Sequence, residues 1–126
     1  MSAKSFEQLR VYQLSEELAD MIWDIARAWD LLAKDTIGKQ MIRSADSIGA
    51  NIAEGYGRGS FQDNRRFVRT SRGSLYETPH WLRRAFKRGL LNGTQVSALK
   101  QVVDNLGPQL NAYLKSIGPK SRPGDQ

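Results

Sequence analysis

Apolar side chains recur at steps of three and four residues in four separate segments of this chain, a spacing that predicts helices. The segments run from about residue 6 to 32, from Asp35 or Thr36 to Glu54, from Ser60 to Gly89, and from Asn92 to Gly118. The most regular segment has the pattern of a bundle seam, with Val96, Leu99, Val103, Leu106, Leu110, Tyr113 and Ile117. No strand pattern competes with these segments. We therefore expect an all-α fold, an antiparallel up-down-up-down four-helix bundle.

The second predicted helix combines a narrow apolar stripe with unusually small side chains. These small residues are Ser44, Ser47, Gly49, Ala50 and Ala53. They would let neighbouring helix backbones approach closely, so we expect this helix to be surrounded by others. Gly55, Gly57 and Gly59 follow, and we expect them to end the helix through left-handed dihedrals. A phosphate loop is disfavoured because no G-x-x-x-x-G-K-[ST] pattern occurs.

Local signals refine the third and fourth helices. Ser60 and Asn92 are expected N-caps, each followed three residues later by a polar side chain suited to a capping box. An inward stripe is predicted on the third helix, from Phe67, Val68, Ser71, Leu75, Thr78, Leu82 and Phe86. Pro79 predicts a kink near Leu75 to Thr78, and Gly107-Pro108 predicts a bend or break in the last helix.

The length of 126 residues is suited to one domain with one core, which we place at residues 1–118, followed by a flexible tail at 119–126. The chain has no cysteine, so disulfides and thiolate metal sites are not available. No apolar run approaches the roughly 20 residues of a membrane helix, and no apolar signal core follows the N-terminus. We expect a cytoplasmic protein without a membrane partner.

Positive charge is concentrated in the third helix and the turn before it. Residues 58–88 carry a net charge of +7, whereas the rest of the chain carries −1. Arginine forks suit phosphate and carboxylate groups, so a polyanion or an acidic protein is the expected partner. The candidate nucleic-acid-binding residues are Arg58, Arg65, Arg66, Arg69, Arg72, Arg83, Arg84, Lys87 and Arg88. The alternatives are a solvated face or ion pairs with the acids of the first helix in another subunit.

A set of polar residues is expected to fix the register of the second and third helices rather than to form an active site. This set comprises Ser47, Asn51, Glu54 and Glu77, which could hydrogen-bond to one another or to Arg43 and Arg58. Catalysis finds little support because His80 is the single histidine. The carboxylates of the first helix are not accompanied by the Glu-x-x-His motifs of di-metal bundles. We expect no enzyme activity, no cofactor and no metal.

From Phe6 to Ile117 the sequence resembles the four-helix bundle family of 23S rRNA intervening-sequence proteins. The resemblance is densest in K-Q-M-I-R-S-A-D-S-I-G-A-N-I-A-E-G-Y-G-R, residues 39–58, and in F-V-R-T-S-R-G-S-L-Y-E-T, residues 67–78. It implies an antiparallel bundle assembling into a ring, typically a homopentamer, with a basic surface and no established catalytic activity. Relatives are similar to the accessory protein of diversity-generating retroelements, which is thought to engage nucleic acid and a reverse transcriptase.

Two functional hypotheses follow from the charge pattern and the resemblance. The first is a non-enzymatic, ring-like accessory protein that binds RNA or DNA through the basic face of its third helix. The second is a protein-interaction scaffold with an acidic protein partner and no role in nucleic-acid binding. The two hypotheses differ in the salt dependence of nucleic-acid binding, which should be steep for the first.

Overall fold

A computed structural model describes residues 5–119 of the chain, and this region is helical, with no strand among its residues. A short 3-10 turn, η1 (Phe6–Gln8), precedes the first long helix. The long helices are α1 (Arg10–Ala26), α3 (Lys39–Tyr56), α4 (Phe61–Lys87) and α5 (Gly93–Ser116). Between α1 and α3 lie one helical turn, α2 (Leu31–Ala33), and a π-helical segment, η2 (Lys34–Gly38). The predicted tail, apart from Pro119, lies outside the described residues.

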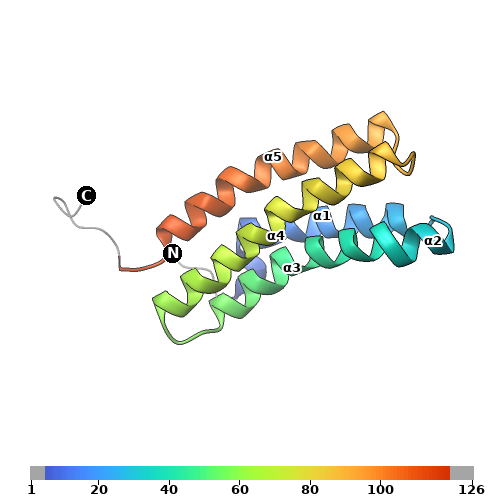
Figure 1. Cartoon of the computed structure of the whole chain (residues 1–126). Coiled ribbons are helices and arrows are strands. Elements are labelled where there is room, and N and C mark those ends of the chain that lie inside the picture. The colour runs from blue at the N-terminus through green and yellow to red at the C-terminus, as the bar shows by residue number, and fades with distance from the viewer. Residues whose placement is uncertain (1–4, 120–126) are drawn as a thin grey trace.

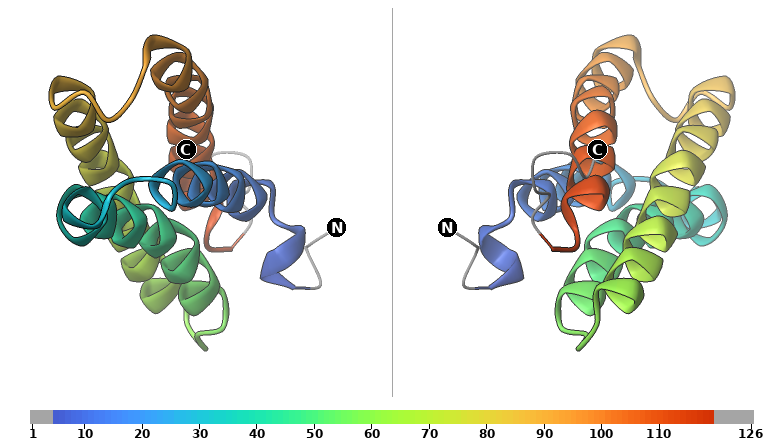
Figure 2. Two further views of the ribbon diagram at one scale, coloured as in Figure 1. Left: turned by 90° about the vertical axis from the view of Figure 1, so that its right-hand side faces the viewer. Right: turned by 90° about the vertical axis from the view of Figure 1, so that its left-hand side faces the viewer.

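The four long helices form a bundle in which consecutive helices run in opposite directions (Figure 1). Helix α1 packs against α3 and α5, and α4 packs against the same two helices. The turn between α3 and α4 lies at one end of the molecule, and the turn between α4 and α5 lies at the other (Figure 2). The predicted all-α four-helix bundle is therefore confirmed.

The core is built from the apolar stripes of all four long helices. Its largest fully buried side chains include Leu14, Leu18, Ile22, Met41, Ile48, Ile52, Val68, Leu99, Leu106 and Leu110. Burying one such side chain contributes about 1.5–3 kcal/mol relative to leaving it exposed, so this core is the main source of stability. None of the described helices combines the length and apolarity needed to cross a membrane.

Two glycines of α3 mark where neighbouring helices approach most closely. A methyl group on Gly49 would lie 2.8 Å from Ser15 Oγ of α1, and one on Gly55 would lie 2.7 Å from Asn64 Oδ1 of α4. Both distances are too short for a real Cβ contact. The prediction that small residues let neighbouring helices approach closely is thus confirmed at Gly49, whereas the close approach at Gly55 was not predicted.

The predicted dihedrals of the glycine-rich turn are wrong. Gly55 lies inside α3, and Gly57 caps the helix with φ −80°, in the right-handed helical region. Within residues 5–119, positive φ occurs only at Gly89 and Gly118. The helix ends without a left-handed residue because the amides of Gly57 and Arg58 still donate to Ala53 and Gly55, at 3.2 and 3.1 Å. Gly89, with φ 74°, follows α4 as predicted.

The first helix ends earlier than its apolar pattern predicts. Helix α1 stops at Ala26, and Leu32, which the pattern placed on the inner face, is 76% exposed. The next helical turn is capped by Asp30, whose Oδ1 accepts a hydrogen bond from the Ala33 amide at 3.0 Å. Asp35 and Thr36, the predicted caps, lie inside η2, because Asp30 already satisfies a free amide of the helix start. Ser5 makes no capping hydrogen bond.

The start signals of the last two helices hold. Ser60 Oγ accepts from the Asp63 amide at 3.1 Å, and Asn92 and Gln95 form a reciprocal capping box. Neither proline ends its helix, since α4 continues through Pro79 and α5 through Pro108. Of the predicted bend or break at Gly107-Pro108, the break is wrong, and the bend stays a prediction. Near the end of α4, Ala85 takes the fully buried position, and Phe86, predicted to point inward, is half exposed.

Candidate nucleic-acid interface

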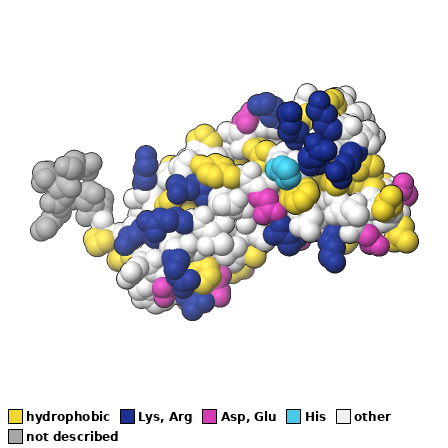
Figure 3. Space-filling view, viewed as in Figure 1, with side chains coloured by type: hydrophobic (Ala, Val, Ile, Leu, Met, Phe, Trp, Pro, Cys, Tyr) yellow, Lys and Arg dark blue, Asp and Glu magenta, His cyan; other side chains and the backbone are white. Residues whose placement is uncertain are grey.

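The predicted basic residues occupy two groups at opposite ends of α4. The turn-side group lies beside the α3–α4 turn and comprises Arg58, Arg65, Arg66, Arg69 and Arg72. The distal group lies at the C-terminal end of α4 and comprises Arg83, Arg84, Lys87 and Arg88. On the face of the molecule in Figure 3, Lys and Arg side chains gather toward both ends, with a less charged surface between them.

Two guanidinium groups of the turn-side group are held against one aromatic ring. The Arg58 and Arg66 guanidiniums lie 4.7 and 4.6 Å from the centroid of the Phe67 ring. Each also forms an ion pair on its own stretch of chain, Arg58 with Glu54 at 3.0 Å and Arg66 with Asp63 at 3.5 Å. Exposed ion pairs of this kind contribute about 0–1 kcal/mol, so a phosphate group could replace the carboxylates at low cost.

Arg65 and Arg72 connect α4 to α5. Arg65 Nη1 donates to the backbone oxygen of Ile117 at 2.8 Å, and Arg72 Nη1 donates to Asn111 Oδ1 at 3.2 Å. The carbonyls at the end of a helix lack internal donors, and a cation there also complements the helix dipole. These two arginines therefore have a structural role in addition to their charge.

The remaining cations have no compensating partner within the described part of the chain. Their side chains make neither an ion pair nor a hydrogen bond there; these residues are Arg69, Arg83, Arg84, Lys87 and Arg88. All except Arg84 are exposed, and Arg84 is partly exposed. An unpaired, hydrated arginine or lysine is free to meet a polyanion, so these residues form the active part of the candidate interface.

The predicted polar set does not form one network in the described structure. Asn51 Nδ2 donates to the backbone oxygen of Ser47 at 2.8 Å, and Glu54 pairs with Arg58. Glu77 is the member that joins two helices, because its carboxylate pairs with Arg43 of α3.

Neighbouring side chains stabilise the ionised form of Glu77. Its Oε2 accepts a hydrogen bond from Trp81 Nε1 at 2.7 Å. This hydrogen bond, together with the charge of Arg43, holds the pKa of Glu77 below its usual value. The only acid between the two cation groups is therefore already engaged with side chains of the protein itself.

A set of buried hydroxyls was not predicted as a network, although Ser71 and Thr78 were placed on the inner stripe. Ser71 Oγ donates to the backbone oxygen of Ile48 at 2.7 Å, and Thr78 Oγ1 donates to Ser44 Oγ at 3.0 Å. All three hydroxyl-bearing residues are fully buried. The sequence feature that could have predicted this network is a serine or threonine at core positions of both α3 and α4.

The described residues, 5–119, hold no arrangement of side chains suited to binding a metal ion. No three side chains of histidine, cysteine, aspartate or glutamate lie together there in a way that could hold a metal ion. His80 packs edge-on against Trp81, with ring centroids 4.7 Å apart. A groove of about 330 Å³ between α1 and α3 is lined in part by Glu16, Asp20 and Asp46.

The fold is an all-helical bundle. On its surface, α4 presents cations that have no partner in the described part of the chain. The sequence model of the family described as 23S rRNA-intervening sequence protein matches residues 7–112, so the chain belongs to that family. A crystal structure from Bacteroides thetaiotaomicron is similar, a protein of unknown function from the S23 ribosomal protein family. It shares 24% identity with a TM-score of 0.75, over 84% of this chain and 96% of that one, which supports the fold alone. No curated protein matches the sequence.

Proposed function

We propose that this protein is a non-enzymatic accessory factor that binds nucleic acid through the exposed face of α4. The observation that carries the proposal is a set of cations on α4 and at its C-cap without partners in the described chain, namely Arg69, Arg83, Arg84, Lys87 and Arg88. Phosphates would replace the water and counterions around these side chains, and counterion release would drive binding. Arginine is suited to this role because its planar fork meets two phosphate oxygens at once.

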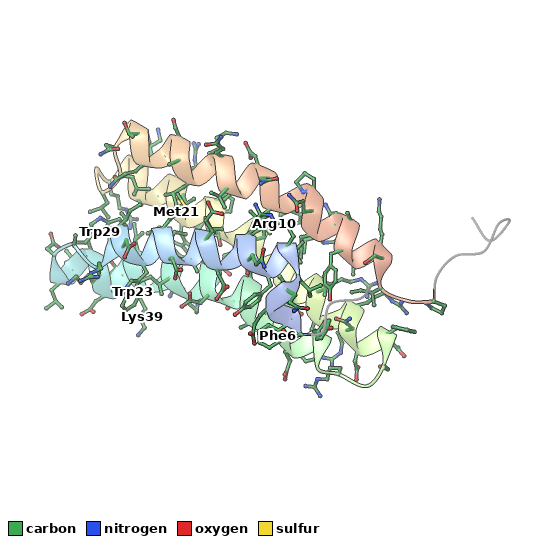
Figure 4. All side chains as sticks on the ribbon, turned by 180° about the vertical axis from the view of Figure 1, so that it is seen from behind. Phe6, Arg10, Met21, Trp23, Trp29 and Lys39 are labelled. Atoms are coloured by element: carbon green, nitrogen blue, oxygen red, sulfur yellow. The ribbon has the colours of Figure 1, made fainter. Side chains whose placement is uncertain are left out.

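The experiment is a mobility-shift series with RNA, duplex DNA and an RNA–DNA hybrid over increasing salt. The proposal predicts that affinity falls between about 50 and 200 mM salt, by roughly 100-fold for a single strand and roughly 500-fold for a duplex, because about five cations contact phosphate. Arg69→Glu/Lys87→Glu should weaken binding strongly, so that the shift at low salt needs a much higher protein concentration. The matched control is Arg10→Glu/Lys39→Glu, which changes the net charge by the same amount. Both residues are labelled in Figure 4, which views the molecule from the side opposite to Figure 1. Equal loss in both double variants would contradict a specific face.

The second part of the proposal is self-association into a ring, with five copies as the expected number. Trp23 and Leu31 are 54% and 73% exposed, as is common at protein interfaces. Light scattering on the purified protein tests this assembly; a monomer at all concentrations would contradict it.

A second candidate function is a scaffold for an acidic protein. A groove of about 380 Å³ between α4 and α5 is lined by the apolar residues Leu82, Phe86, Val96 and Val103 and by the charged residues Arg83, Lys100 and Asp104. Such a groove suits a partner segment with apolar and acidic side chains. Under this alternative, Phe86→Ser abolishes binding of the acidic protein partner, and the wild-type protein binds neither RNA nor DNA.

A further inference from the structure

A cation pattern occurs twice on α4. Residues 65–69 read R-R-F-V-R and residues 83–87 read R-R-A-F-K, so Arg-Arg-x-x-cation recurs after 18 residues. At 3.6 residues per turn, 18 residues are five whole turns, and each cation lies on the same side of the helix as its counterpart. The rise of 1.5 Å per residue separates the two copies by about 27 Å. Helix α4 is continuous over both copies.

An exposed aromatic side chain lies between the two copies on the same side of α4. Tyr76 follows Arg65 by eleven residues, about three turns, and precedes Arg83 by seven residues, about two turns. It is 66% exposed, and its side chain makes no hydrogen bond or ring contact within residues 5–119. Asp104 of α5 lines the same hollow as Tyr76 and is paired with Lys100 at 2.6 Å. Glu77, the next residue along α4, is bound by Arg43 and Trp81. This side of α4 therefore presents cations, an open aromatic ring, and cations again.

From this order we infer that α4 binds one single strand of nucleic acid across both cation groups, with a base stacked on Tyr76. The inference rests on the proposed function and names its ligand. Binding without sequence preference to single strands combines a positive track for phosphates with aromatic side chains for unpaired bases. Bases in a duplex already stack on one another, so a duplex would use the cations and leave Tyr76 unused. At a rise of roughly 3.4 Å per nucleotide, the two groups span about eight nucleotides of a stacked strand.

The length of the ligand provides the first test. Fluorescence anisotropy would compare the affinity of three oligothymidylates, whose lengths are half of this roughly eight-nucleotide span, the full span, and twice the span. The affinity is expected to rise by about tenfold or more when the strand first reaches both groups, because the second contact becomes intramolecular. On the full-span strand, Arg69→Glu or Lys87→Glu alone should each cost about tenfold. On the half-span strand, each should cost about twofold, because the other group still binds.

Tyr76 provides the second test. Tyr76→Leu is expected to weaken full-span binding by about fivefold or more, whereas Tyr76→Phe keeps the ring and should bind as the wild type does. Circular dichroism melting would verify that all variants remain folded. A duplex of equal length should bind Tyr76→Leu and wild type alike.

The possible results separate the inference from the proposed function. If salt-sensitive binding persists but shows no step in length, or if Tyr76→Leu binds single strands like wild type, the single-strand track is wrong and the proposed function stands. If a duplex binds more tightly than the single strand, the track is also wrong. If no nucleic acid binds at low salt, both are wrong.

Discussion

Thr78 of α4 donates a hydrogen bond to Ser44 of α3 at 3.0 Å, and both side chains are fully buried. The Thr78 residue precedes Pro79, so this contact fixes α4 against α3 at the point where the proline removes a backbone donor. A buried hydroxyl without its partner costs about 1–3 kcal/mol. The contact therefore contributes to the register of the two helices that carry the candidate interface.

Thr78→Val should lower the free energy of unfolding by about 1–2 kcal/mol, because it removes a buried hydrogen bond while keeping the shape of the side chain. Denaturant unfolding measures this change. The double variant Ser44→Ala/Thr78→Val should lose less than the two single variants together, since the hydrogen bond that the two residues share can be lost only once. Additive losses would contradict a direct coupling between the two residues.

Glycine at position 55 should be required for the close approach of α3 and α4. Gly55→Ala is expected to destabilise the protein by about 1–3 kcal/mol, because the new methyl group would meet Asn64 Oδ1 at 2.7 Å. Gly73→Ala is the matched control on α4, where a methyl group meets nothing within 4 Å. It should stabilise the protein by about 0.5–1 kcal/mol through helix propensity. Thermal melts that changed in the same direction for both would contradict the packing argument.

Glu77 should make stability depend on acid pH. The Trp81 hydrogen bond and the Arg43 charge lower its pKa in the folded protein, so the ionised form is favoured by folding. Its contribution is present above the ordinary glutamate pKa of about 4.3 and is lost as the pH falls through the lower folded value. Glu77→Gln should be less stable than wild type at neutral pH, with the difference shrinking in acid. A difference that is constant with pH in denaturant unfolding would contradict this.

Asp46 should have the opposite effect. Partial burial and the nearby charge of Asp20 raise its pKa, so folding favours the protonated form. Stability is then lost as the pH rises from the ordinary aspartate pKa through the raised folded value. Asp46→Asn should raise the melting temperature at neutral pH and have little effect in acid. A lower melting temperature at neutral pH would indicate that Asp46 is paired, for example with a cation of another copy.

The sequence predicted the elements of this fold better than their ends. Three-four periodicity identified all four long helices because burial of one apolar face determines them. The end of α1 was misplaced because Leu32 continues the apolar spacing although its side chain is exposed. The role of Gly55 was misassigned because a glycine suits a left-handed turn and a close helix contact equally well. Only the position of Asn64 on α4 distinguishes the two.

The candidate interface could be predicted as a charged segment but not as a set of available residues. Arg65 and Arg69 cannot be distinguished by sequence. In the structure, Arg65 donates to the end of α5, whereas Arg69 has no partner in residues 5–119. That distinction depends on which helix lies beside each arginine. The contact of Arg58 and Arg66 with Phe67 likewise depends on how the α3–α4 turn folds back.

The most direct test of the account is the slope of log affinity against log salt for a single-stranded oligonucleotide, compared between the two matched double variants. Each cation that contacts a phosphate contributes about −0.7 to this slope. If α4 carries the nucleic-acid interface, Arg69→Glu/Lys87→Glu reduces the magnitude of the slope by at least about 1.4, while Arg10→Glu/Lys39→Glu leaves the slope unchanged. An equal reduction in both variants would show that net charge alone drives binding, which would contradict a nucleic-acid interface on α4.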